Sequence, residues 1–143
     1  VLHRLGTKHS LVVHGMDGMD EISIEGKSLV WDVNQDRVLP PYEVSPEDFG
    51  FRKASTAEVR GGTPEENAEM LRHILKGEKE AKRNIVVMNA AAALVVGNQA
   101  SNLKEGVRIA EEAIDSGKAQ AKLDELVKLS RSLKEALNTK NLG

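Results

Sequence analysis

The pattern of apolar residues changes once along the chain, close to Thr63, and this change limits what the sequence can fold into. Before it, short apolar and β-branched runs alternate with glycines and turn residues, which is typical of strands. After it, apolar residues recur every three or four positions, which is typical of amphipathic helices. Strands followed by helices favour a sheet covered by a helical layer, so we expect an α/β or α+β fold.

The first half predicts a partial sheet. Residues 10–14 form a short apolar run ended by a glycine, which indicates a buried strand of the parallel type. Residues 22–24 alternate as a further short strand would. A buried parallel strand needs neighbours on both sides, so we expect part of this sheet to be contributed by residues outside the chain.

A hairpin is predicted next. The ranges 27–33 and 37–44 are apolar and β-branched, and the turn residues 34–36 separate them. Pro40 and Pro41 lack amide donors, so the second strand should be an edge strand or an extended passage.

Four helices are predicted in the second half. Thr63 is a good N-cap, Pro64 suits the first helical position and Glu66 completes a capping box. Small residues line the second helix from Asn89 onward, which favours close helix packing, and Asn89 must find a hydrogen-bond partner if it is buried. The expected helical ranges are 63–76, 84–96, 103–115 and 118–137.

Composition excludes several classes of function. A net charge of -2 and four aromatic residues among 143 argue against a nucleic-acid partner. The absence of cysteine excludes disulfides, thiolate zinc sites and a cysteine nucleophile. The longest uncharged run, residues 85–97, is too short to span a bilayer, so we expect no membrane segment. Because the chain begins with Val1 and shows no signal-peptide pattern, we expect either a processed chain or a piece of a longer one.

Acidic residues concentrate in the first third, where residues 1–50 hold nine acidic and four basic side chains. Asp20 and Glu21 are adjacent there and follow a turn containing Gly15 and Gly18. Mg²⁺ keeps several waters and needs only one or two protein carboxylates beside phosphate groups. The pair therefore fits a site for a metal and a phosphate, to which Asp17 could add an indirect contact, and the alternative is a solvated acidic loop.

The other polar candidates are less specific. His14 lies at a strand end and could orient a substrate, whereas a packed or solvent-bonded histidine is the alternative for it and for His3, His9 and His73. The glycines at 61–62 open a helix and could bind an anion at their amides, but the segment lacks the Lys of a phosphate-binding loop, so helix capping is the better interpretation.

Five strings in order resemble the anthranilate phosphoribosyltransferase family. Residues 13–23, VHGMDGMDEIS, resemble that family's VHG-x-DG-x-DE segment. The others are PEDFG within residues 45–50, GG and ENA within 61–68, NAAAAL at 89–94, and the spaced residues EG, A, AI and SGKA within 105–119.

The resemblance implies an enzyme that joins anthranilate to phosphoribosyl pyrophosphate in tryptophan biosynthesis and needs Mg²⁺. By motif match, Asp20 and Glu21 would bind that Mg²⁺ beside the pyrophosphate. It also implies a cytoplasmic homodimer joined through helices of an N-terminal domain. Residues 1–143 would then be the C-terminal part of an α/β domain of the nucleoside phosphorylase and phosphoribosyltransferase type.

The family's GTGGD and KHGNR segments have no counterpart here. Phosphate binding needs many convergent amides and cations, so we expect the isolated chain to be inactive. Three interpretations stay open: a C-terminal fragment of the transferase, a short non-catalytic binding or assembly module with the same fold, and a relative of pyrimidine nucleoside phosphorylase. The VHG-x-DG-x-DE string argues against the last.

Overall fold

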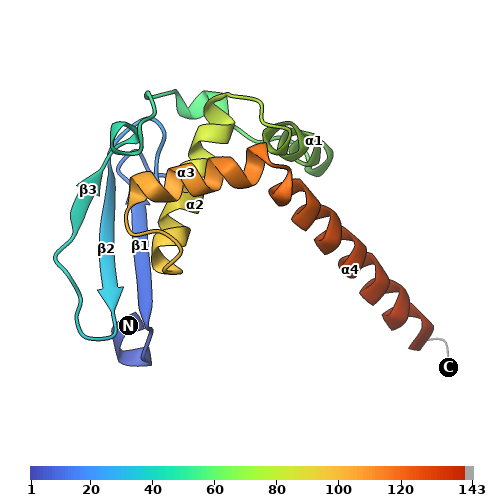
Figure 1. Ribbon diagram of the computed structural model, residues 1–143, viewed down its shortest axis with the longest axis horizontal. Helices are drawn as coiled ribbons and strands as arrows, with labels where there is room; N and C mark the ends of the chain where they lie inside the picture. Colours follow the sequence, from blue (N-terminus) through green and yellow to red (C-terminus); the bar gives the residue numbers. More distant parts are fainter. Residues whose placement is uncertain (141–143) are drawn as a thin grey trace.

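A three-stranded sheet stands beside two packed helices, and a long final helix extends away from them (Figure 1). The computed structural model describes residues 1–140, with side chains through residue 137. The strands are β1 (His9–Gly15), β2 (Ser28–Asn34) and β3 (Tyr42–Val44). The helices are α1 (Pro64–Leu75), α2 (Ala81–Val96), α3 (Leu103–Asp115) and α4 (Lys118–Lys140), and single 3-10 turns cover Leu2–Leu5, Pro46–Phe49 and Thr56–Val59.

The sheet confirms the expected partial sheet but corrects the direction of its first strand. Its order is β1-β2-β3, and both pairings are antiparallel, with Gly15 opposite Ser28 and His9 opposite Asn34. The loop of residues 16–27 turns the chain back beside itself, whereas a parallel neighbour would need a longer crossover. The expectation of a parallel-type strand at 10–14 was therefore wrong for its observed partner.

The expected hairpin forms, although its second strand is interrupted. The Asn34 side-chain oxygen accepts the amides of Asp36 and Arg37, at 3.1 and 3.0 Å, which shapes the turn. Val33 and Val38 then form an isolated bridge, and regular pairing resumes only in β3. The break falls at the two prolines, because a proline has no amide to donate to a neighbouring strand.

Residues 22–24 are not a strand, so the expectation of a further short strand there was wrong. Ser23 is buried and its hydroxyl accepts the amides of Glu25 and Gly26 at 3.0 and 3.1 Å, so its side chain competes with the strand pattern. Ile22 and Ile24 are nevertheless buried in the core. The alternation correctly indicated burial, but the backbone there is a loop.

The helices largely follow the expected ranges. In α1 the hydroxyl of Thr63 accepts the Glu66 amide at 3.3 Å, while the Glu66 carboxylate accepts the Thr63 amide at 2.7 Å, which confirms the capping box. Helix α2 begins at Ala81 rather than at residue 84. The Asn84 amide donates to the Glu80 carbonyl at 3.1 Å, so Asn84 lies inside the first turn.

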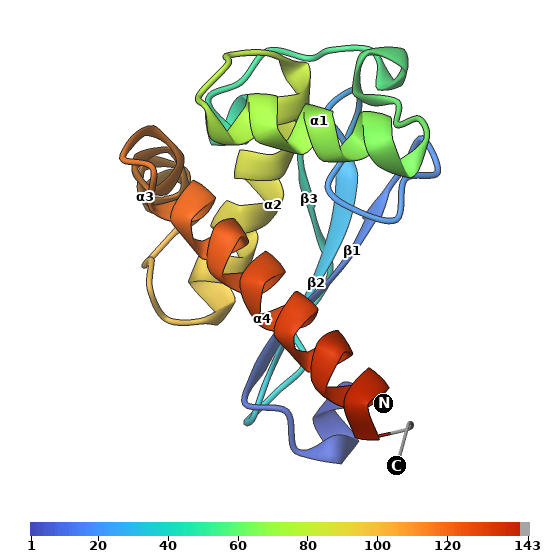
Figure 2. The ribbon, with the colours of Figure 1, turned by 90° about the vertical axis from the view of Figure 1, so that its right-hand side faces the viewer.

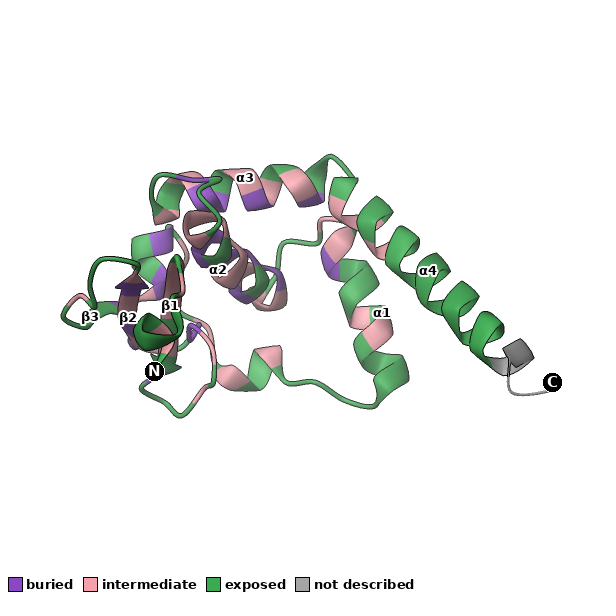
Figure 3. Cartoon of the chain, turned by 90° about the horizontal axis from the view of Figure 1, so that it is seen from below, coloured by how far each residue is buried: buried purple, intermediate pink, exposed green. Residues whose placement is uncertain are grey.

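The core lies between the sheet and the pair α2 and α3, and burial is concentrated there (Figure 3). The apolar side of β2, the buried loop isoleucines and the small-residue side of α2 meet in one cluster. Its buried members include Ile22, Ile24, Val30, Val44, Phe49, Val87, Met88, Ala91, Val107, Ala110 and Ile114.

Helix α4 contacts the rest of the chain only near its start and then projects outward (Figure 2). Ala119 packs against the core, whereas Leu126, Leu133 and Leu137 keep 61, 57 and 63% of their surface exposed. Helix α4 thus carries apolar side chains that the described chain leaves largely uncovered. Among the described residues, no helix is both long enough and apolar enough to cross a membrane.

Candidate metal centre

The loop between β1 and β2, residues 16–27, begins with a tight turn at Gly15. The Gly15 amide donates to the Met19 carbonyl at 2.9 Å, and the Gly18 amide donates back to the Gly15 carbonyl at 2.9 Å. A Cβ on Gly15 would lie 2.6 Å from Oδ1 of Asp17 and 2.8 Å from Cβ of Met19. Glycine is therefore required at residue 15 for reasons of space, and at residue 18 because its φ is +99°.

Asp17 connects two parts of the loop through hydrogen bonds. Its carboxylate accepts the hydroxyl of Ser23, and it accepts the Met19 amide at 3.2 Å. The Ser23 hydrogen bond is the main reason that the pKa of Asp17 lies below its ordinary value. Asp17 thus has a structural role within the loop, which the sequence alone did not distinguish from a metal contact.

Asp20 and Glu21, here called the carboxylate pair, differ from the other acids of the loop. Glu25 accepts a hydrogen bond from the Thr56 amide at 2.8 Å, and Asp17 accepts hydrogen bonds from Ser23 and Met19. In contrast, neither member of the pair has a hydrogen bond or ion pair within residues 1–137. Asp20 is exposed and Glu21 is half-buried. Burial, and then the neighbouring negative charge of Asp20, raise the pKa of Glu21 above its ordinary value.

These properties fit a bound divalent cation. Two adjacent carboxylates without a counter-charge repel each other, and a cation relieves that repulsion. Within the described chain, no group of three or more acidic or histidine side chains could enclose a metal, so the pair is an open, partial donor set. Mg²⁺ accepts such a set when phosphate oxygens and water complete its coordination.

Asn89 of α2 holds the backbone next to the carboxylate pair. Its side-chain oxygen accepts the Ile22 amide at 3.0 Å, and its Nδ2 donates to the Ile22 carbonyl at 3.3 Å and to the Ile85 carbonyl at 3.0 Å. The expected need of Asn89 for a partner is confirmed. A groove of about 380 Å³, whose lining includes Leu11, Ile22 and Asn89, lies between β1 and α2 beside this contact.

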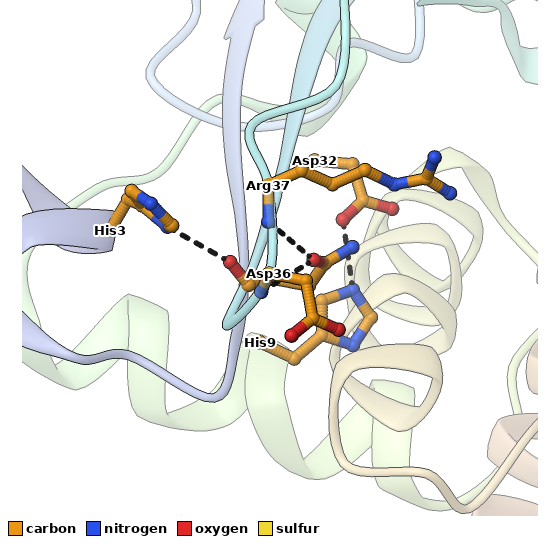
Figure 4. A network of polar contacts seen from close by, with 6 residues as sticks. His3, His9, Asp32, Asp36 and Arg37 are labelled. Carbon is orange, nitrogen blue, oxygen red and sulfur yellow. Dashed lines mark hydrogen bonds and ion pairs between the residues drawn. The ribbon is translucent and has the colours of Figure 1, made fainter.

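The histidines do not join the carboxylate pair in a cluster. At the opposite end of the strands, Nε2 of His9 lies 3.1 Å from Oδ1 of Asp32, and Nδ1 of His3 lies 3.2 Å from the Asn34 carbonyl oxygen (Figure 4). His73 lies 2.6 Å from a Glu78 carboxylate oxygen. Each of these three imidazoles thus contacts an oxygen atom of the protein itself. His14 is exposed on β1, and its substrate-orienting role stays a prediction.

The remaining candidates lie apart from the loop. The Gly62 amide donates to the Asn67 side-chain oxygen at 2.8 Å, and Asn67 Nδ2 returns a bond to the Gly62 carbonyl at 3.1 Å, so this segment serves helix capping. A cavity of about 270 Å³ between α1 and the start of α2 is lined by residues that include Glu69, His73 and Arg83. No residue of the loop 16–27 lines this cavity, so the cavity is not part of the site at the carboxylate pair.

Comparison with known proteins matches residues 1–120 to the family described as "Glycosyl transferase family, a/b domain". The chain is 49% identical over 132 residues to the anthranilate phosphoribosyltransferase of Acetivibrio thermocellus, which covers 92% of this chain and 38% of the relative. It is also 49% identical over 142 residues to that of Methanococcoides burtonii, covering 97% of this chain and 40% of the relative. The chain thus spans about two fifths of the length of these relatives.

Solved structures give the same result. The anthranilate phosphoribosyltransferase of Thermus thermophilus superimposes with a TM-score of 0.81 at 37% identity, over 91% of this chain and 38% of that one. The enzyme of Saccharomyces cerevisiae in complex with PRPP and Mg superimposes with a TM-score of 0.79 at 28% identity, over 88% and 36%. Each of these relatives carries the transferase name rather than that of a nucleoside phosphorylase.

Proposed function

This chain belongs to the glycosyl transferase family whose a/b domain matches residues 1–120, and we propose that it acts as the C-terminal part of an anthranilate phosphoribosyltransferase. The whole protein would transfer the phosphoribosyl group of phosphoribosyl pyrophosphate to anthranilate in the cytoplasm, in tryptophan biosynthesis. The motif order, the identity to named transferases and the fold support this assignment.

The single observation that carries the proposal is the unpartnered carboxylate pair. The other loop acids with shifted pKa values, Asp17 and Glu25, are engaged by the protein's own donors, whereas Asp20 and Glu21 have no donor within residues 1–137. We assign the pair to Mg²⁺. A bound Mg²⁺ would neutralise charge on the departing pyrophosphate. This chain's residues hold the cation and fix the loop; the phosphate-cradling amides and the anthranilate contacts belong to other parts of the enzyme.

The isolated chain should therefore be inactive, since one metal-binding loop does not form a phosphate site. The homodimer that the resemblance implies is part of the same proposal and would use helices outside the matched region. A short non-catalytic module stays the alternative outcome of the test below.

A chimera tests the proposal. The C-terminal part of the Acetivibrio thermocellus enzyme would be replaced by the equivalent residues of this chain, over the 132 aligned positions. We expect the chimera to form phosphoribosyl anthranilate, measured by the loss of anthranilate fluorescence. Asp20→Ala or Glu21→Ala should lower kcat/KM by at least 100-fold at fixed Mg²⁺, which is the order of effect expected when a transition-state charge loses its stabiliser.

Asp36→Ala is the matched control, because this exposed acid lies at the far end of β2 and only its backbone amide takes part in the turn. Full activity in the Asp20 and Glu21 variants would overturn the metal assignment. A folded but inactive chimera would favour the non-catalytic module. Turnover by the isolated chain above an Asp20→Ala control would contradict the expected inactivity.

A further inference from the structure

The backbone of the carboxylate pair is held at both ends. Upstream, the Met19 carbonyl accepts the Gly15 amide at 2.9 Å, which ties the loop to the end of β1. Downstream, Ile22 exchanges two hydrogen bonds with the side chain of Asn89. The pair occupies the only two positions between Met19 and Ile22, so its main chain runs between two fixed points.

Asn89 is well suited to hold the second of these points. It projects from the middle of α2, whose neighbouring residues Val87, Met88 and Ala91 are fully buried. Its Nδ2 also donates to the Ile85 carbonyl at 3.0 Å, one turn back on the same helix, which restrains the side chain. The amide therefore connects the loop to the most buried helix of the described chain.

The Asn89 contact acts on the peptide next to Glu21. The Ile22 amide that Asn89 accepts belongs to the same planar peptide group as the Glu21 carbonyl. Fixing that plane limits the directions in which the Glu21 side chain can leave the backbone. A cation that takes two side-chain donors binds more tightly when their backbone is already ordered.

We propose that Asn89 is a positioning residue of the metal site, which holds Ile22 so that Asp20 and Glu21 can share one divalent cation. The inference rests on the proposed metal role of the carboxylate pair. Groups that orient metal ligands without touching the metal typically change metal affinity by about 10- to 100-fold when removed.

The test uses this chain and Mn²⁺, an oxygen-preferring probe that can be titrated by electron paramagnetic resonance. Asn89→Leu removes both polar groups while keeping a similar volume. We expect it to weaken Mn²⁺ binding by about 10-fold or more. Hydrogen exchange at the Ile22 amide, measured by NMR without metal, should also become faster. Ile114→Val, a mild truncation of a buried residue in α3, should leave both readings unchanged.

The outcomes separate the two proposals. Binding that Asp20→Asn does not reduce would overturn the metal role itself, as would absence of Mn²⁺ binding to the unmodified chain when inorganic phosphate is added to complete the coordination. Binding that Asp20→Asn abolishes and Asn89→Leu leaves unchanged would overturn only the role of Asn89. Equal weakening by Asn89→Leu and Ile114→Val would show a general stability effect, which also contradicts the positioning role.

Discussion

A Cβ atom on Gly106 would lie 2.7 Å from the carbonyl oxygen of Ala91 and 2.9 Å from its Cα. Both residues are buried, and they mark the point where α3 crosses the backbone of α2. The small residues after Asn89 thus serve close helix packing, as the sequence indicated. This approach matters for the site because the same helix carries Asn89.

Gly106→Ala should destabilise the fold. In an exposed helix this change would stabilise by about 1 kcal/mol, because alanine is the better helix former. Here the added methyl group overlaps backbone atoms, and overpacking of this kind costs about 1–3 kcal/mol. We expect the clash to dominate and the free energy of unfolding in urea to fall.

Gly26→Ala is the matched control for Gly106→Ala. No atom lies within 4 Å of a Cβ on Gly26, and its φ is outside the left-handed region. It should leave the free energy of unfolding unchanged or slightly higher. A Gly106→Ala protein as stable as Gly26→Ala would show that α2 and α3 are not in backbone contact.

Asp115→Ala should lower stability through Arg83. Arg83 is only 2% exposed, and its Nη2 lies 2.7 Å from Asp115, whereas Nη1 lies 3.5 Å from Glu111. Removing the shorter contact leaves a buried charge with a weak partner, at a cost of about 1.5–3 kcal/mol. Removing an acid from a helix C-terminus returns about 0.3–1 kcal/mol. We expect a net loss of roughly 1–2 kcal/mol in chemical unfolding.

Glu112→Ala in the same last turn is the control, since it shares the helix-end effect but pairs with the exposed Arg108 at 3.3 Å. Exposed pairs of this kind contribute about 0–1 kcal/mol. Equal losses in the two variants would contradict the importance of the buried guanidinium.

Helix capping within one turn, and acidic residues adjacent in the chain, could be predicted from the sequence. The capping pair of Thr63 with Glu66 was recognisable because both partners lie within one helical turn. The acidic pair Asp20 and Glu21 was identified for the same reason, as adjacent residues after a glycine turn.

Contacts between distant segments could not be predicted. Asn89 lies 67 residues from Ile22, and sequence alone indicated only that Asn89 needed some partner. The prediction of a parallel first strand was wrong for a similar reason, because apolar character indicates burial and not the direction of the neighbouring strand.

The prediction of a strand at residues 22–24 was wrong for a local reason. The Ser23 hydroxyl accepts the amides of Glu25 and Gly26, which therefore do not pair with a neighbouring strand.

Gly15→Ala should disturb the loop that carries the carboxylate pair. The added methyl group would meet Oδ1 of Asp17 at 2.6 Å and Cβ of Met19 at 2.8 Å, so the turn has to open. We expect a loss of about 1–3 kcal/mol from overpacking. Mn²⁺ affinity should fall as well, because Met19 borders the pair. Unchanged Mn²⁺ affinity would show that the turn does not hold the pair.

Asp17→Asn should destabilise the chain in a pH-dependent way. The Ser23 hydrogen bond lowers the pKa of Asp17 below its ordinary value of 3.8, so the ionised carboxylate stabilises the folded state. That contribution is complete above about pH 4 and disappears as the pH falls through the lowered pKa. At pH 7 we expect Asp17→Asn to cost about 1 kcal/mol in urea unfolding. Near pH 2.5 the two proteins should differ less.

Asp36→Asn is the control, and its stability difference from the parent should stay small at both pH values. A difference for Asp17→Asn that stays constant between pH 7 and pH 2.5 would show that the carboxylate charge does not hold this loop.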